Sequence, residues 1–270
     1  MTTTTFPATV PVSTERSSLV KAASDTMAIT WRNLLMLRRV PQLLVFSTIQ
    51  PVLFVLMFRY VFGGAIRVPG VRYVDYLMPG IFAQTVAFGS INTGVGLAQD
   101  LGTGLIERFR SLPMARSAVL AGRTAADVVR NVLVVTLMVS VGFIVGFRVH
   151  TNAAGLLAAV GLMLLFGFAL SWLFALIGLA TANPESAQAA AFPLLAPLVF
   201  ASSAFVPLKS MPGWLQVFAA HQPVTITVDA VRALVLGGPT LRPVVQMLAW
   251  AVGLVAVFAP LAVSRYRRAA

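Results

Sequence analysis

Six long apolar stretches limit what this chain can fold into. Each has about the 20 residues that an α-helix needs to cross the hydrocarbon core of a bilayer. They are residues 43–62, 76–97, 126–147, 153–180, 187–205 and 244–263. The chain is 58% hydrophobic and only 10% charged, whereas soluble domains carry about 25% charged residues. We therefore expect an all-α polytopic membrane protein with six transmembrane helices.

The distribution of basic residues predicts the orientation of these helices. With both termini in the cytoplasm, thirteen Lys and Arg residues lie on the cytoplasmic side and seven on the other. Cytoplasmic loops are the ones that carry an excess of Lys and Arg. Arg outnumbers Lys by eighteen to two, a bias typical of GC-rich bacterial genomes. We therefore expect a multi-pass protein of the bacterial cytoplasmic membrane with both termini inside. The net charge of +12 is then explained by basic residues in the loops between spans. We therefore expect no nucleic-acid partner.

The two ends of the chain differ from the apolar middle. Residues 1–23 are rich in Thr, Ser and Pro and lack the apolar run of a signal peptide or a spanning helix. This composition predicts a disordered cytoplasmic tail. Residues 265–270 form a short basic tail, and residues 41–264 hold the predicted transmembrane domain.

Residues 24–40 predict an amphipathic helix before the first span. Apolar side chains recur there at helical spacing, and Trp31 suits the depth of the lipid headgroups. Pro41 separates this helix from the span. We expect it to lie along the inner membrane surface as an interface helix, and the alternative is a plain extension of the first span. Its candidate contact residues are Trp31, Arg32, Arg38 and Arg39.

Residues 207–239 are too polar and too broken to span. Two short apolar helical pieces, 213–220 and 225–236, flank the sequence HQP, and Gly237 and Gly238 follow the second piece as glycines do past a helix end. Backbone at membrane depth must be protected by protein. We therefore expect a re-entrant helical pair on the outer face, directly before the last span.

Catalytic and nucleotide-binding motifs are absent from the sequence. There is no P-loop, no HExxH and no GxSxG, and no Cys for a thiolate site. His150 and His221 fall in loops, where we expect them to be solvated. Asp127 and Arg130 are three residues apart, a spacing that favours a structural salt bridge on one helix face. We therefore expect a chain that is not an enzyme and binds no cofactor itself.

Polar residues inside the spans are candidates for a transport pathway, because they are costly in lipid. An interhelical hydrogen bond, worth about 0.6 kcal/mol on average, is an equally good explanation for each. The nearby glycines at 89, 94 and 96 predict close helix packing in the second span. The candidate pathway residues are Gln50, Gln84, Ser90 and Asn92.

A short charged segment, GLIERFRSLPMARS, interrupts the apolar chain at residues 104–117. Leu105 and Phe109 share one face of a helix, while Glu107 points to the other side. Pro113 limits the helix to about two turns, which is too short to be stable alone. The segment therefore needs a membrane surface or a partner protein to hold it.

The order of these features resembles the permease subunits of ABC-2-type exporters, especially those of the daunorubicin-resistance type. The likeness covers nearly the whole chain. It is carried by TWRNLLMLRR before the first span, YLMPGIFAQTVAFGSINTGVGLAQD as the second, GLIERFRSLPMARSAVLAGR after it, NPESAQ between the fourth and fifth, and PLKSMPGWLQVFAAHQPVTITVDAVRALVLGG before the sixth.

This resemblance implies a function. The segment after the second span would be a coupling helix that docks on a separate ATP-binding subunit, with ATP and Mg²⁺ bound there. Two such subunits would serve a dimer of permeases, formed with a second copy or a related chain. The substrate would be hydrophobic or amphipathic: a drug, a lipid or a glycolipid-like molecule. The implied coupling residues are Leu105, Glu107, Arg108, Phe109 and Arg110.

Other function classes stay open at this point. A secondary transporter should carry an acid or a His in the middle of a span for ion coupling, and none falls there. An intramembrane enzyme lacks its nucleophile and base. A membrane scaffold that transports nothing is compatible with the sequence.

Overall fold

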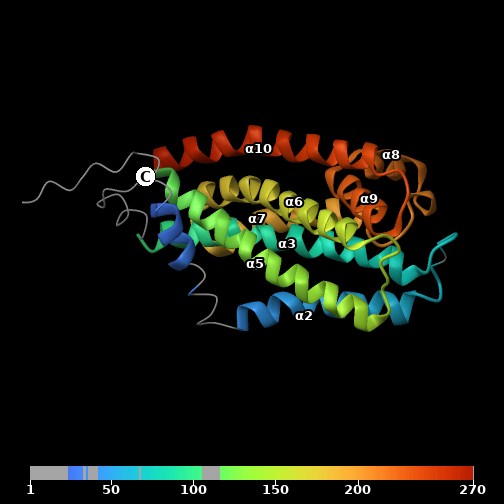
Figure 1. The fold of residues 1–270 in the computed structure, drawn as a ribbon. Coiled ribbons are helices and arrows are strands. Elements are labelled where there is room, and N and C mark those ends of the chain that lie inside the picture. Colours follow the sequence, from blue (N-terminus) through green and yellow to red (C-terminus); the bar gives the residue numbers. More distant parts are fainter. Residues whose placement is uncertain (1–23, 33–34, 36–41, 67, 105–115, 270) are drawn as a thin grey trace, which may run out of the picture.

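The computed structural model describes residues 24–32, 35, 42–66, 68–104 and 116–269, and within these ranges all regular secondary structure is helical. The long helices run roughly side by side (Figure 1). They are α2 (Gln42–Leu56), α3 (Tyr73–Gly102), α5 (Arg116–Val145), α6 (Ala153–Ala180), α7 (Pro184–Phe200) and α10 (Leu241–Ala269). A π-helix (Met57–Phe62) continues α2, and residues 24–32 form a further helix.

Four helices are long and apolar enough to cross a membrane. They lie within Tyr73–Gly102, Gly122–Val145, Ala153–Ala180 and Leu241–Arg268. The segment Thr48–Phe62 is a shorter apolar helix, and α7 has 17 residues with Pro193 and Pro197 inside it. The coarse prediction of an all-helical polytopic membrane protein is therefore confirmed.

The helix bounds differ from the predicted spans mainly at their polar ends. The predicted span 153–180 coincides with α6. Helices α3 and α10 extend beyond both ends of the predicted spans 76–97 and 244–263, whereas α5 begins before the predicted span 126–147 and ends two residues short of it. Hydropathy marks only the apolar part of a helix, and these helices continue into polar sequence. By contrast α7 ends at Phe200, five residues before the end of the predicted span 187–205. The predicted N-terminal tail, residues 1–23, lies outside the described residues, as do Arg38 and Arg39 of the predicted interface helix. At the other end of the chain, α10 continues through most of the predicted basic tail, residues 265–270.

Local sequence sets several helix ends. The side chain of Asn152 accepts a hydrogen bond from the Gly155 amide at 2.8 Å, and Asn183 does the same for Ser186 at 2.8 Å. Such N-caps satisfy amide groups that have no partner within the helix. Gly237, with φ of 95°, follows α9 (Pro223–Leu236), where a left-handed conformation favours glycine. The expected stop after the second outer helix is confirmed.

Helix α3 is the most enclosed long helix and packs against α5, α6, α7 and α9. Its closest contact is with α6. A Cβ atom on Gly178 would lie 2.1 Å from the carbonyl oxygen of Gly94, and one on Gly94 would lie 2.3 Å from the carbonyl oxygen of Phe174. Small residues allow such close backbone approach between membrane helices. The predicted close packing of the second span is therefore confirmed at Gly94.

Two short helices, α8 (Gly213–His221) and α9 (Pro223–Leu236), lie at one end of the molecule, and helix 24–32 lies at the other (Figure 1). α8 exposes an apolar face that includes Trp214, 76% exposed, and Val217, 66% exposed. α9 is instead largely buried. The predicted pair of short helices therefore exists, with one member at the surface and one in the core.

Arg232 links α9 to α3 through its guanidinium group. Arg232 is on α9, and its guanidinium lies 3.5 Å from the centre of the Tyr76 ring. It donates to the carbonyl oxygen of Tyr76 at 3.0 Å, to that of Ser203 at 2.5 Å and to the Asp229 carboxylate at 3.1 Å. The Tyr76 hydroxyl in turn donates to the Ser203 carbonyl at 2.9 Å. A planar guanidinium has enough donors to reach several acceptors at once, which the ammonium of a lysine cannot do in the same geometry.

The glycine contact between α3 and α6 gives a test of the packing. We expect Gly178→Ala to lower the melting temperature of the purified protein, because its new methyl group meets the backbone of α3. Overpacking of this kind costs about 1–3 kcal/mol. Gly161→Ala on the same helix is the control, since nothing lies within 4 Å of its Cβ position. Equal melting temperatures for the two variants would contradict the packing described.

The arginine anchor gives a second test. Arg232→Lys is expected to destabilise the protein by about 2–5 kcal/mol, because it leaves buried acceptors of the anchor unpaired. Thermal unfolding in detergent measures the loss. The matched control is Arg242→Lys at the start of α10, where the side chain is exposed. If Arg232→Lys and Arg242→Lys have the same melting temperature, the guanidinium hydrogen bonds of Arg232 are not needed for stability.

Candidate functional site

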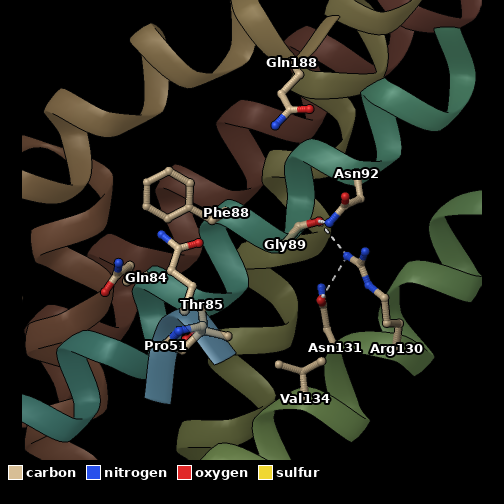
Figure 2. Close-up of a pocket in the computed structure, with 11 residues that line it drawn as sticks. Pro51, Gln84, Thr85, Phe88, Gly89, Asn92, Arg130, Asn131, Val134 and Gln188 are labelled. Atoms are coloured by element: carbon tan, nitrogen blue, oxygen red, sulfur yellow. Dashed lines mark hydrogen bonds between the residues drawn. The ribbon is translucent and has the colours of Figure 1, made fainter. Parts of the chain in front are cut away.

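A polar cavity of about 370 Å³ opens between helices of the bundle (Figure 2). This volume is near the lower end of the range for ligand pockets. The wall comes from α2, α3, α5 and α7, so four helices far apart in sequence contribute to it. The lining residues are Gln50, Pro51, Gln84, Thr85, Phe88, Gly89, Asn92, Arg130, Asn131, Val134 and Gln188.

The carboxamide of Gln84 is the unusual group in this wall. The residue is only 2% exposed, and its Oε1 atom has no hydrogen-bond partner in the described part of the chain. Leaving a buried acceptor without a donor costs about 1–3 kcal/mol. Thr85 beside it donates its hydroxyl to the Ile81 carbonyl at 2.7 Å and is therefore not the missing donor.

Arg130 is the charged residue of the cavity wall, and Asp127 pairs with it from outside the lining. The Arg130 Nη2 atom lies 3.6 Å from the Asp127 carboxylate and donates to the Gly89 carbonyl oxygen on α3 at 2.5 Å. The other carboxylate oxygen of Asp127 accepts from the Thr93 hydroxyl. The predicted salt bridge between Asp127 and Arg130 is confirmed, and it also fixes α5 to α3. Figure 2 shows Arg130 reaching toward Gly89.

The structure separates the four candidate pathway residues. Gln50, Gln84 and Asn92 line the cavity. The hydroxyl of Ser90 instead donates to the Val86 carbonyl at 2.9 Å and to the Gly167 carbonyl on α6 at 3.0 Å. Ser90 therefore makes the interhelical hydrogen bond that was the alternative explanation. A transport role for the other three stays a prediction.

Two cavity residues, Asn131 and Gln188, were not predicted from the sequence. Asn131 lies on α5 with Arg130, and Gln188 lies on α7 at the far end of the cavity from Pro51 (Figure 2). A helical spacing of 127, 130, 131 and 134 places four lining or supporting side chains on one face of α5. The spacing of these residues on α5 could have been read from the sequence. No second described lining residue stands at helical spacing from Gln188 on α7, so the sequence did not mark Gln188 in the same way.

A second polar cluster lies at the end of the bundle that holds helix 24–32. Asp100, near the end of α3, pairs with Arg32 at 3.5 Å and with Arg123 on α5. The hydroxyl of Thr30 donates to the Gly122 carbonyl on α5 at 3.1 Å. A Cβ on Gly122 would lie 2.6 Å from the Cβ of Ile29. Helix 24–32 is therefore fixed to the two helices, α3 and α5, that flank residues 105–115.

The predicted contact residues of this region are only partly described. Trp31 is 63% exposed, and Arg32 pairs with Asp100. The coupling residues Leu105, Glu107, Arg108, Phe109 and Arg110, like Arg38 and Arg39, lie outside the described residues. Asp100 and Arg123 are the contacts that sequence reasoning missed. They are far apart in the chain, and nothing in their local pattern pairs them.

Comparison with known proteins identifies the family. The model of the family "ABC-2 type transporter" matches residues 24–236. The daunorubicin resistance ABC transporter permease protein DrrB1 of Streptomyces coeruleorubidus is 35% identical, over 94% of this chain and 89% of the relative. The probable doxorubicin resistance ABC transporter permease protein DrrC of Mycobacterium tuberculosis is 31% identical, over 83% and 81%. The chain belongs to the ABC-2 type transporter family and is a transmembrane permease subunit of an ABC exporter.

Proposed function

We propose that this permease exports an amphipathic substrate, such as a drug, a lipid or a glycolipid-like molecule, across the bacterial cytoplasmic membrane. ATP and Mg²⁺ would be bound by two copies of a separate ATP-binding subunit. The observation that carries the proposal is the polar cavity among apolar helices, since buried polar groups in a membrane helix mark a pathway or a binding site. The relatives named for resistance to daunorubicin and doxorubicin support a drug as one substrate.

The proposed topology has six spans with both termini in the cytoplasm. Besides the four long candidate spans, α2 with its π-helical continuation and α7 would be the other two. The loop bias in Lys and Arg supports this orientation. Figure 1 supports it too, because helix 24–32 and the end of α10 lie at the same end of the bundle. α8 and α9 would then lie on the outer face as the re-entrant pair, with the exposed Trp214 of α8 at the lipid headgroups.

The proposed coupling surface is the end of the bundle that carries Asp100. Leu105, Glu107, Arg108, Phe109 and Arg110 would dock on the ATP-binding subunit. A short helix can transmit motion only if its flanking helices move with it. The pairing of Asp100 with Arg32 and Arg123 supports this, because it joins helix 24–32, α3 and α5 into one unit. Helix 24–32 would then serve as the interface helix on the inner membrane surface.

The transport pathway would include the cavity lined by Gln50, Gln84 and Asn92. A second permease copy, identical or related, would complete the passage. The long helix α10 supports a partner or lipid contact, because only 17% of its most apolar window is buried within the chain. Substrate would enter from the inner leaflet or the cytoplasm.

Reconstitution tests the proposed function. The full chain is combined in liposomes with an ABC-type ATP-binding subunit from the same organism, and ATP-dependent efflux of daunorubicin is measured. We expect efflux, and we expect Glu107→Ala and Phe109→Ala to lower both the copurified ATPase and the efflux while membrane insertion is unchanged. Copurification and efflux equal to those of the wild type would contradict the coupling role of residues 105–110.

The Asp100 cluster provides a separate prediction. Asp100→Asn is expected to reduce copurification of the ATPase about tenfold, the equivalent of 1.4 kcal/mol, because helix 24–32 loses its ionic contact with α3. Asp100→Glu keeps the charge and should retain most of the association. If Asn and Glu at this position behave alike, the ionic contact does not hold the docking surface together.

A further inference from the structure

One partly buried arginine has no counter-charge in the described part of the chain. Five arginines are partly buried there. Four of them pair with a carboxylate: Arg32 and Arg123 with Asp100, Arg130 with Asp127, and Arg232 with Asp229. The fifth is Arg59, in the π-helix Met57–Phe62 that continues α2. Arg59 makes neither a hydrogen bond nor an ion pair among the described residues.

The outer edge of the Arg59 guanidinium is accessible. Its Nε atom is buried without a hydrogen-bond partner. The two Nη atoms likewise have no partner among the described residues, but they are not buried. Arginine uses such adjacent N–H donors to bind two oxygens of a carboxylate or a phosphate at once. The side chain therefore presents unused donors to whatever surrounds the helix.

Aromatic contacts hold this part of the π-helix in place. The ring of Phe58 stacks on the ring of Phe205, with centroids 4.6 Å apart, and Phe205 is buried. The guanidinium of Arg59 lies 5.8 Å from the centre of the Tyr60 ring, within the range of a cation–π contact. The cation is therefore positioned by its neighbours. Segments of π-helix are rare and occur frequently at functional sites.

The surface next to Arg59 is apolar and aromatic. Tyr60 is 69% exposed and Val61 is 70% exposed, and the apolar helix to which they belong ends at Phe62. Tyrosine at the end of a membrane helix lies at the level of the lipid headgroups, and an arginine there extends its charged group to the same level. Figure 1 places this end of α2 at the end of the bundle that holds α8 and α9.

The ligand that fits this surface is an anion with an apolar part. A guanidinium without a counter-ion at the edge of the bilayer costs free energy, and its adjacent donors match the oxygens of a phosphate. A soluble anion would gain nothing from the exposed side chains of Tyr60 and Val61. A phospholipid carries both a phosphate for the guanidinium and acyl chains for the apolar surface.

We propose that Arg59 and Tyr60 form a binding site for a membrane phospholipid, whose phosphodiester oxygens accept hydrogen bonds from the two Nη atoms of Arg59. The acyl chains lie along the exposed side chains of Val61, Met57 and Leu53, which follow one another at helical spacing. The inference goes beyond the proposed function and shares with it only that α2 and its π-helical continuation form a span.

Lipid binding by the purified full chain tests the proposal. The protein in a nonionic detergent is titrated with dioleoylphosphatidylglycerol, and bound lipid is counted by native mass spectrometry. Dioleoylglycerol, which has the same acyl chains but no phosphate, and inorganic phosphate are the comparison probes. We expect the Kd of the tightest phosphatidylglycerol site to lie about tenfold below that of dioleoylglycerol. Inorganic phosphate in excess should leave the phospholipid bound.

Variants of Arg59 test the assigned cation. Arg59→Gln should raise the Kd for phosphatidylglycerol about tenfold, because charge-assisted hydrogen bonds to the phosphate are lost. The melting temperature of the lipid-free protein should not fall, since Arg59 has no hydrogen bond within the described chain. Arg59→Met provides a second uncharged replacement if the glutamine variant is poorly folded. The matched control is Arg242→Gln, an exposed arginine at the start of α10, which should bind like the wild type.

The proposal is overturned if both Arg59 variants bind phosphatidylglycerol like the wild type, which would leave the guanidinium to an acidic group of a partner protein. It is equally overturned if Arg242→Gln weakens binding as much, or if inorganic phosphate displaces the lipid. None of these measurements needs the ATP-binding subunit or a drug. Phospholipid binding at Arg59 without ATP-driven efflux would therefore contradict the exporter function alone. Efflux without that binding would contradict the phospholipid site alone.

Discussion

The close contact between α3 and α6 is the constraint on which the rest of the structure depends. Gly94 and Gly178 bring the two backbones so near that even a methyl group has no room. In a lipid environment, packing of this kind replaces the hydrophobic drive that assembles soluble helices. With α6 fixed on one side, the remaining surface of α3 is available to α5, α7 and α9. The cavity, the Asp100 cluster and the Arg232 contacts are therefore all built on α3.

Polar side chains in this fold fall into two groups. Most are satisfied within the chain: Ser90 bonds to α6, Arg232 fixes α9 and the segment after α7 to α3, and Asp100 joins helix 24–32 to α3 and α5. These contacts hold helices together. Gln84 differs, because its buried oxygen has no partner in the part of the chain described. Unsatisfied buried groups are unusual in native proteins, and the Nε atom of Arg59 and the Nε1 atom of Trp172 are further examples among the described residues.

The sequence predicted the helical class and most helices, because apolar runs of about 20 residues have few alternatives in a membrane. It also predicted the salt bridge between Asp127 and Arg130, which depends only on helical spacing. The cavity could not be predicted in full, because Gln50, Gln84 and Gln188 come from three helices whose relative rotation is set by packing. For the same reason a sequence pattern could not distinguish the bonded Ser90 from the unpaired Gln84. Asp100 and Arg123 likewise meet only in the folded chain.

One consequence concerns the length of α3. The same uninterrupted helix carries Asp100 near one end and Tyr76 near the other, and the rise of an α-helix places them roughly 36 Å apart. Asp100 is joined to helix 24–32, and Tyr76 is joined to α9 through Arg232. α3 is thus a long helix with fixed contacts at both of its ends. A tilt imposed on its Asp100 end displaces the α9 end without any rearrangement in between, so the two ends of the bundle are mechanically connected through a single helix.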